Sequence, residues 1–175
     1  MSETIEKPAF QIFRMMDSPS LDEVGAMALR QSEDEIVEAG INELIANGGQ
    51  EGGTVKTLFN FPGFSLTYAW FKSGYPLPLH SHDADCLYYV ISGTLKLGTE
   101  LLNKGDGFFV PAETPYTYTP GDKGVEILEF RHATQFDIHF RGSSPSFWQK
   151  IADRAGERRD GWADEVEPSR QHGSD

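Results

Sequence analysis

The chain is poor in cysteine, in basic residues and in long apolar runs, and each shortage excludes a class of protein. Its single cysteine, Cys86, rules out a disulfide within the chain. Fifteen lysines and arginines stand against 27 aspartates and glutamates, and the net charge of −12 argues against nucleic acid or an anionic membrane as a partner. No apolar run is long enough to span a bilayer, and the first residues lack the layout of a signal peptide, so we expect a cytoplasmic protein.

Charge and aromatic content divide the chain of 175 residues into three segments. Residues 1–51 carry three basic and eleven acidic side chains, whereas 16 of the 21 aromatic residues lie between positions 54 and 140. The core is therefore expected in the middle of the chain. We predict an N-terminal extension over residues 1–51, a β-barrel over 52–140, and a C-terminal helix followed by a disordered tail over 141–175.

Helix signals occur on both sides of the middle segment. Two capping-box patterns, Ser20–Glu23 and Ser32–Glu35, predict two consecutive helices or one bent helix, ending at Asn47-Gly48-Gly49. Before them, a loose alternation at residues 8–16 favours an edge strand, added to this sheet or to a partner's sheet. Pro145 suits the first position of a short C-terminal helix.

From Thr54 onward the apolar period changes from 3.6 residues to 2, which is typical of strands. Glycine, proline and aspartate interrupt the pattern about every ten residues, as in a sandwich or barrel of short strands. The predicted strands cover residues 54–61, 64–72, 86–91, 94–98, 107–110, 116–119, 125–131 and 135–140.

The most informative stretch runs from Gly74 through His80 and His82 to Cys86, and then along an alternating strand to a Ser-Gly turn at Gly93. Side chains two residues apart on a strand point to the same side, so the two imidazoles are expected to lie together. Neutral imidazole is the commonest protein ligand of first-row divalent metals, and we predict that His80 and His82 bind one. The competing interpretation is a pair of histidines that only form hydrogen bonds.

These residues resemble the motifs of the cupin superfamily, G-x5-H-x-H-x3,4-E-x6-G and G-x5-P-x-G-x2-H-x3-N. The resemblance covers residues 54–140 and implies an all-β fold, the cupin jelly-roll barrel, here with an N-terminal helical extension and a short C-terminal helix. The matching positions are Gly74, His80, His82 and Gly93 in the first motif, and Gly105 and Pro111 in the second. The departures are Cys86 for the glutamate, Glu113 for the second motif's inner glycine, Tyr116 for the histidine and Pro120 for the asparagine.

Cys86 therefore has two interpretations. As a thiolate it is a soft anionic metal ligand in place of the motif glutamate, which favours zinc or a thiolate-tolerant iron or copper site. As a thiol it is a small buried residue at the start of an inward-facing strand. Asp85, in the loop with Asp83, is the second choice for the missing carboxylate, although aspartate is ordinary in a turn.

Tyr116 stands where the family has its third histidine, and it is our candidate catalytic residue. It can act as a phenolate ligand, as a general base or as a donor to a substrate oxygen, or it can simply fill space with its hydroxyl bonded to a neighbour. Tyr88 and Tyr118 are expected to form a substrate-binding aromatic pocket with it, suited to a small and partly apolar molecule.

A third imidazole can come from His132, which we favour over His139, if its side chain faces inward. The pattern leaves this open, because two alternating sets of residues compete for the inner face of the strand. One set contains Val125, Ile127 and Glu129, and the other Leu128, Phe130 and His132. Glu113 and Glu129 are further candidates, as proton shuttles.

The resemblance implies a metal-binding enzyme acting on a small organic acid, ketone or phenol, of the dioxygenase, lyase or isomerase type. Its cofactor would be a divalent transition metal, with iron or zinc preferred. The alternative is a non-catalytic cupin that binds a small molecule without metal, as the lost glutamate and histidine suggest. A third role is assembly: cupins commonly dimerise, and we expect a homodimer in which apolar Phe10, Ile12 and Phe13 cross to the partner.

Overall fold

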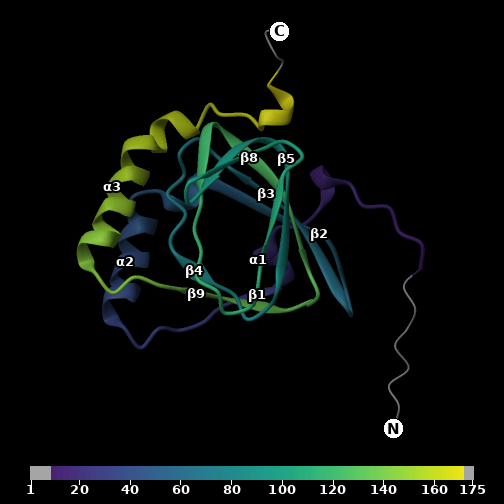
Figure 1. The fold of residues 1–175 in the computed structure, drawn as a ribbon, viewed down its shortest axis with the longest axis horizontal. Helices are drawn as coiled ribbons and strands as arrows, with labels where there is room; N and C mark the ends of the chain where they lie inside the picture. Colours follow the sequence, from purple (N-terminus) through teal and green to yellow (C-terminus); the bar gives the residue numbers. More distant parts are fainter. Residues whose placement is uncertain (1–8, 172–175) are drawn as a thin grey trace.

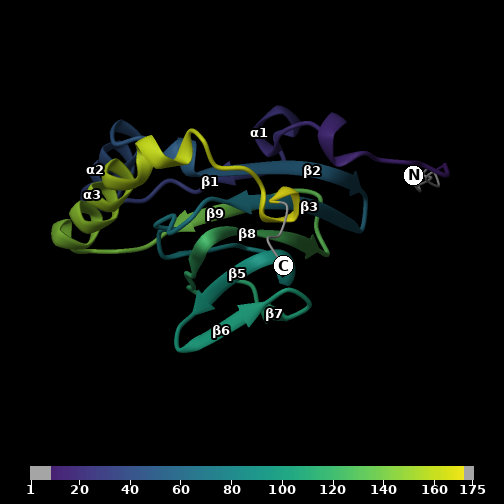
Figure 2. The ribbon, with the colours of Figure 1, turned by 90° about the horizontal axis from the view of Figure 1, so that it is seen from above.

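The computed structural model describes residues 9–171 and shows two β-sheets with helices outside them (Figures 1 and 2). The larger sheet has the strand order β2-β3-β8-β5-β6, with β7 also paired to β5, and the smaller sheet has the order β1-β9-β4. This arrangement confirms the predicted all-β barrel. The strands are β1 (Met27–Leu29), β2 (Gly53–Phe61), β3 (Phe64–Phe71), β4 (His80–Ser81), β5 (Cys86–Leu97), β6 (Glu100–Asn103), β7 (Gly107–Val110), β8 (Thr119–Arg131) and β9 (Phe136–Phe140).

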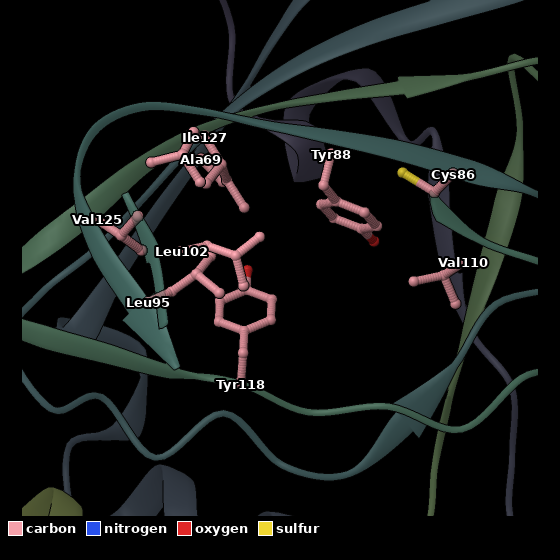
Figure 3. Packing of buried hydrophobic residues seen from close by; sticks show 10 residues of the cluster. Ala69, Cys86, Tyr88, Leu95, Leu102, Val110, Tyr118, Val125 and Ile127 are labelled. Atoms are coloured by element: carbon pink, nitrogen blue, oxygen red, sulfur yellow. The ribbon is translucent and has the colours of Figure 1, made fainter. Parts of the chain in front are cut away.

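The main core lies on the inner face of the larger sheet. Along β5, Cys86, Tyr88 and Val90 are buried while Leu87 and Tyr89 are exposed, which is the alternation of a strand with one buried face. Figure 3 shows the inward side chains pointing toward one another from several strands. The cluster consists of Ala69, Cys86, Tyr88, Val90, Leu95, Leu102, Val110, Tyr118, Val125 and Ile127.

β5 is one strand where the sequence predicted two. It continues past Gly93, and its pairing with β8 shifts register between Val90 and Ser92 and again between Gly93 and Leu95. The predicted Ser-Gly turn is therefore a bulged stretch of a continuous strand. Gly93 has a φ of +73°, and a Cβ there would come within 2.2 Å of the carbonyl oxygen of Gly124.

β8 decides which residues face the barrel interior. Val125, Ile127, Glu129 and Arg131 are all buried, whereas His132 is exposed beyond the end of the strand. The prediction that His132 supplies a third imidazole is therefore wrong. A separate strand at residues 116–119 is also not formed, because Tyr116 makes only an isolated bridge before β8 begins at Thr119.

The first capping box forms as predicted. The Ser20 hydroxyl accepts from the Glu23 amide at 3.2 Å, and the Glu23 carboxylate accepts from the Ser20 amide at 2.7 Å. The helix that follows, α1 (Leu21–Val24), ends at once at Gly25, which has a φ of +65°. The predicted helix beyond it is replaced by β1, which pairs in parallel with β9.

The second helix, α2 (Glu35–Ala46), forms, but its N-cap is Asp34 rather than Ser32. The Asp34 side chain accepts from the Ile36 amide at 2.9 Å. Within residues 9–16 the structure has a 3₁₀ turn, η1 (Met15–Asp17), and no strand, while Pro8 lies outside the described residues. A further 3₁₀ turn, η2 (Gly49–Gly52), leads into β2.

The C-terminal helix is longer than predicted. α3 (Pro145–Trp162) packs beside α2 outside the barrel, and it is followed by η3 (Pro168–Arg170) (Figure 1). Trp162 is buried, and its indole donates to the Ser73 carbonyl at 3.0 Å. Residues 157–162 are therefore helical rather than frayed, and residues 172–175 lie outside the described range. In the described part of the chain, no helix is long and apolar enough to cross a membrane.

Candidate functional site

His80 and His82 lie side by side in the barrel, where His80 begins the short strand β4 and His82 follows its last residue. His80 exchanges two backbone hydrogen bonds with Tyr116, at 3.1 and 2.9 Å, and it is also in register with Phe140 of β9. Only 3% of His80 and 6% of His82 is exposed, and their ring centroids are 5.1 Å apart. The structure thus brings the two imidazoles together, as their spacing predicted.

The backbone fixes the tautomer of both imidazoles. His80 Nδ1 lies 2.7 Å from the Pro78 carbonyl oxygen, and His82 Nδ1 lies 2.5 Å from the Asp137 carbonyl oxygen. A carbonyl oxygen only accepts, so each Nδ1 carries the proton and donates it. Each Nε2 then keeps its lone pair, and backbone partners of this kind are what orient metal-binding histidines.

Both imidazoles are neutral near pH 7. Burial, aided by the neighbouring His82, lowers the pKa of His80 to about 4. Burial and the positive charge of Arg131 also lower the pKa of His82. Neutral imidazole is the form that ligates a metal ion, so the electrostatics favour ligation over an ion-pairing role.

The segment that carries His82 is itself held in place. The Asp83 amide donates to the Asp137 carboxylate at 3.1 Å, and the Asp137 amide donates to the Asp83 carboxylate at 2.8 Å. The Ala112 amide donates to the Asp85 carboxylate at 2.8 Å. Both aspartates of the loop therefore bind backbone amides, as aspartates in turns commonly do, and Asp85 does not substitute for the motif glutamate.

Tyr116 lies against the imidazoles, with its ring centroid 4.4 Å from that of His80 and 6.2 Å from that of His82. Its hydroxyl forms a short hydrogen bond with the Tyr88 hydroxyl. Burial and the nearby charge of Glu129 raise the pKa of Tyr116, and burial likewise raises that of Tyr88. Both phenols are therefore protonated at neutral pH, which favours a role as hydrogen-bond donors over a role as a general base.

The other predicted aromatic residue, Tyr118, completes a buried aromatic wall. Its ring stacks with that of Tyr116 at 6.5 Å, and Phe108 stacks on Tyr88 at 4.5 Å. Phe108 also meets Tyr118 edge to face at 6.0 Å. The three tyrosines named from the sequence thus form one cluster, joined by a phenylalanine that the sequence did not single out.

Cys86 lies in the hydrophobic core cluster, 2% exposed. Burial raises the pKa of its thiol to about 12, so the thiol is protonated at neutral pH. Among residues 9–171, no three histidine, cysteine, aspartate or glutamate side chains come together in a group that could hold a metal ion. The predicted ligand set of His80, His82 and Cys86 is therefore not gathered, and the structure favours the interpretation of Cys86 as a small buried residue.

The side chains of two further sequence candidates, His139 and Glu113, join a network around Arg30. His139 contacts Arg30, with His139 Nδ1 3.4 Å from the guanidinium. Arg30 also forms a two-pronged contact with Glu113, at 2.6 and 3.0 Å, and meets Asp137 at 2.5 Å. Glu113 is half exposed in this surface network, which leaves Glu129 as the candidate proton shuttle inside the barrel.

A buried ion pair lies on the strand beside Tyr88 and Cys86. Arg131 donates to Glu129 at 2.8 Å, and Thr67 donates to the same carboxylate oxygen at 3.0 Å. Burial alone would raise the pKa of Glu129, but Arg131 outweighs it and the pKa is lowered, so both groups are charged. In register, Tyr88 faces Glu129 and Cys86 faces Arg131, and Arg131 also donates to the Tyr88 hydroxyl at 3.4 Å.

The region around Glu129 and Arg131, which we call the polar end of the interior, has unused hydrogen-bonding capacity. Arg131 is 2% exposed, yet its Nε has no hydrogen-bond partner within the described residues. The same holds for the hydroxyl of Ser65, which is paired in register with Arg131, and for that of Thr57, which is paired with Thr67. Buried polar groups in native proteins normally have partners, so these atoms indicate a place for a bound molecule or water.

Sequence reasoning missed Arg131, and it named Glu129 only as one of several acids. The sequence did contain a signal, because alternate residues of a strand, here Val125, Ile127, Glu129 and Arg131, lie on one side of it. This series predicts an inward-facing Arg131 only if charged residues are allowed on the inner face. An Arg and a Glu two positions apart on one strand point to the same side and can neutralise each other, which makes their joint burial tolerable.

No protein-family model matches the sequence, and no curated protein matches it. Solved structures with a similar fold include an RmlC-like cupin from Shewanella frigidimarina (21% identity, 47% of this chain and 78% of that chain, TM-score 0.44). A protein of unknown function with a cupin-like fold from Ralstonia eutropha has 23% identity over 67% of this chain and 81% of that chain, with a TM-score of 0.46.

A third similar structure is a salicylate 1,2-dioxygenase from Pseudoaminobacter salicylatoxidans, with 16% identity over 56% of this chain, 31% of that chain and a TM-score of 0.41. Identities and TM-scores of this size establish neither a family nor an activity. The two β-sheets described above agree with the barrel that the two motifs led us to expect.

Proposed function

We propose that this protein is a metal-dependent enzyme acting on a small organic acid, ketone or phenol inside the barrel. The observation that carries the proposal is the pair of buried neutral imidazoles, His80 and His82, whose Nδ1 atoms both donate to backbone carbonyl oxygens. Two such groups with free Nε2 atoms fit a divalent first-row metal, for which imidazole suits iron and zinc alike. The metal would supply Lewis-acid polarisation of a substrate oxygen.

Tyr116 is the residue best placed to act on the substrate. Its protonated hydroxyl lies beside the imidazole pair and is held by Tyr88, so it can donate a hydrogen bond to a substrate oxygen. Tyr118 and Phe108 present flat apolar surfaces behind it, which suits an aromatic or short aliphatic body. Their burial lowers the local dielectric constant, which strengthens each of these polar contacts.

The charges at the polar end of the interior restrict which oxygen-containing group of a substrate can bind there. Arg131 Nε and the Ser65 hydroxyl have no hydrogen-bond partner among residues 9–171 and could each bind an oxygen atom, but Glu129 already balances the charge of Arg131. A second carboxylate at this end would meet the Glu129 carboxylate, whereas a hydroxyl or carbonyl oxygen would accept from Arg131 without repulsion. The substrate we propose therefore presents a neutral oxygen to Arg131.

The proposal is tested by the metal content of untagged protein, measured by elemental mass spectrometry after purification and after reconstitution with iron or zinc. We expect near-stoichiometric metal in the wild type and its loss in the double variant His80→Ala/His82→Ala. The matched control is His132→Ala, which removes an exposed imidazole and should leave the metal content unchanged. Equal metal content in all three proteins, or none in the wild type after reconstitution, contradicts the proposal.

One observation favours a second function, a barrel that binds a small molecule without metal. In the described residues the imidazole pair has no third histidine, cysteine or carboxylate donor. In that case His80 and His82 would be hydrogen-bond acceptors for the ligand through Nε2. A metal-free wild type that still binds small phenols in calorimetry, and loses them on His80→Ala, would establish this function in place of the first.

A further inference from the structure

A cleft of about 280 Å³ lies between α3 and the chain segments on either side of the imidazole pair. We call it the outer cleft, because α3 runs along the outside of the barrel (Figure 1). Thr117 and Thr119, which line it, alternate with Tyr116 and Tyr118, whose rings face the interior. The cleft is therefore separate from the site inside the barrel. Its volume is near the lower limit for small-molecule sites, about 300 Å³.

Most of the outer cleft has apolar walls. The residues that form these walls come from the segment before β4 and from the first two turns of α3, and they are Pro76, Leu77, Leu79, Phe147 and Ile151. The floor is held in place, since the Leu77 carbonyl oxygen accepts from the Thr117 hydroxyl at 2.6 Å and the Leu79 carbonyl oxygen accepts from the Arg141 amide at 2.8 Å. Such a preformed apolar cleft suits a hydrocarbon group.

One side of the outer cleft is basic. Lys150 and Arg154 line it one helical turn apart on α3, and both are exposed. One turn further on, the guanidinium of Arg158 converges with that of Arg154 on Gly74, just before the apolar wall begins. A Cβ on Gly74 would lie 3.1 Å from Arg158 Cζ and 3.4 Å from Arg154 Nη2.

These three cations have no counter-charge in the part of the chain that the structure describes. Lys150, Arg154 and Arg158 form no ion pair there, although the chain has 27 acidic residues against 15 basic ones. The neighbouring Arg159, by contrast, pairs with Glu51 at 2.6 Å. Like charges four residues apart on a helix repel each other, so an anion bound between them would relieve the repulsion.

We propose that the outer cleft binds a small amphipathic carboxylate. Its carboxylate group lies between Lys150 and Arg154, and its hydrocarbon body lies against the apolar walls. Guanidinium and ammonium groups both donate to a carboxylate, whereas an inorganic anion would leave the walls uncovered and a neutral molecule would leave the cations unpaired. The site uses no residue of the barrel interior, so it does not rest on the proposed function.

The test is an NMR titration of the full chain with hexanoate, followed through the backbone amides. We expect saturable shifts at residues 76–79 and 147–154, with a dissociation constant in the millimolar range, as befits a ligand of about eight non-hydrogen atoms. Hexanamide, the neutral amide of the same length, and acetate, which lacks the hydrocarbon body, should each bind at least about tenfold more weakly.

Two variants and a control locate the site. Lys150→Gln/Arg154→Gln should bind hexanoate at least about tenfold more weakly, because it removes both charged donors. The matched control, Lys104→Gln/Lys123→Gln, removes the same charge from exposed lysines that do not line the cleft, and it should bind like the wild type. His80→Ala/His82→Ala should keep the shifts at residues 147–154, since it changes only the interior.

Four results would overturn the inference. The first is an absence of shifts at residues 76–79 and 147–154 up to about 20 mM hexanoate. The second is equal affinity for Lys150→Gln/Arg154→Gln and the wild type. The third is equal affinity for hexanamide and hexanoate. The fourth is a set of shifts that is lost in His80→Ala/His82→Ala, which would place hexanoate inside the barrel. All the replaced lysines and arginines are exposed, and unchanged circular dichroism checks that each variant folds.

Discussion

The buried His80 imidazole makes the protein sensitive to mild acid. Burial lowers its pKa to about 4, whereas the unfolded side chain titrates near 6.5. Between these values the unfolded state binds more protons than the folded state, so stability falls as the pH drops from about 6.5 to about 4. At about 1.4 kcal/mol per pKa unit, lowering the pH from 7 to 5 costs about 2 kcal/mol of unfolding free energy through this one group.

The perturbation is His80→Asn, whose amide can still donate to the Pro78 carbonyl oxygen but does not titrate. Urea unfolding with a chelator present, at pH 7 and at pH 5, gives the unfolding free energy of both proteins. We expect the wild type to lose about 2 kcal/mol more than the variant over this range. His82, whose pKa is also lowered, acts in the same direction in both proteins and cancels in the difference. Equal losses, or an NMR titration of His80 near pH 6.5, would refute the reasoning.

Three further predictions concern the barrel. Arg131→Met should lower the free energy of unfolding in urea by about 3–5 kcal/mol, because it leaves Glu129 charged and unpaired. The double variant Glu129→Leu/Arg131→Met should recover most of this loss, and a double variant no more stable than the single one would contradict the prediction. Gly93→Ala should lower the unfolding free energy by roughly 2–4 kcal/mol, more than the control Gly98→Ala, since both have positive φ but only a Cβ at Gly93 meets a backbone oxygen. Cys86 should react with a thiol reagent at pH 8 only after unfolding, and Cys86→Ala should keep its metal, whereas loss of metal would identify the thiol as a ligand.

The sequence predicted those parts of the fold whose signal is local. Alternation over four or more residues located β7 and most of β2, β3 and β9, because one buried face forces a period of two. β1 has only three residues, and its strand character comes from parallel pairing with β9 far along the chain. No window around Met27–Leu29 contains that information, so the predicted helix was extended beyond the four residues of α1.

The predicted length of α3 was too short because most of its buried stripe is made of small residues. Trp148, Ala152 and Ala155 are fully buried, but two alanines in a charged sequence give a weak apolar pattern. The close packing of the two helices explains why position 40 of α2 is glycine, since a Cβ there would come within 2.1 Å of the Trp148 ring. The helix is thus specified by its fit against α2, which a pattern in one segment does not report.

In the candidate site, the motif register found the imidazole pair and the three tyrosines but not the ion pair. His80 and His82 follow from spacing alone, as does the shared side of Tyr116 and Tyr118. Whether Glu129 or His132 faces inward depends on how β8 is paired with β3 and β5, and a shift by one residue would exchange the two faces. That register depends on contacts between distant strands. The correct alternative, with Glu129 inward, also places charged residues on the inner face, which the sequence pattern disfavours.

The charges of the interior bear on how a substrate would lie in the proposed enzyme. His80, Tyr116 and Cys86 are neutral at pH 7, and Glu129 is balanced by Arg131. The anion that a glutamate supplies in the cupin motif is therefore missing beside the imidazoles. At an effective dielectric constant of 20, an anion 4 Å from a unit positive charge contributes about 4 kcal/mol, so a cation held by two neutral imidazoles gains most from a substrate that brings its own negative oxygen. Because the Arg131 end accepts a neutral oxygen better than a second anion, we expect a hydroxy acid or an acidic phenol to bind with its acidic group toward the imidazoles, where it offsets part of the charge of a divalent metal.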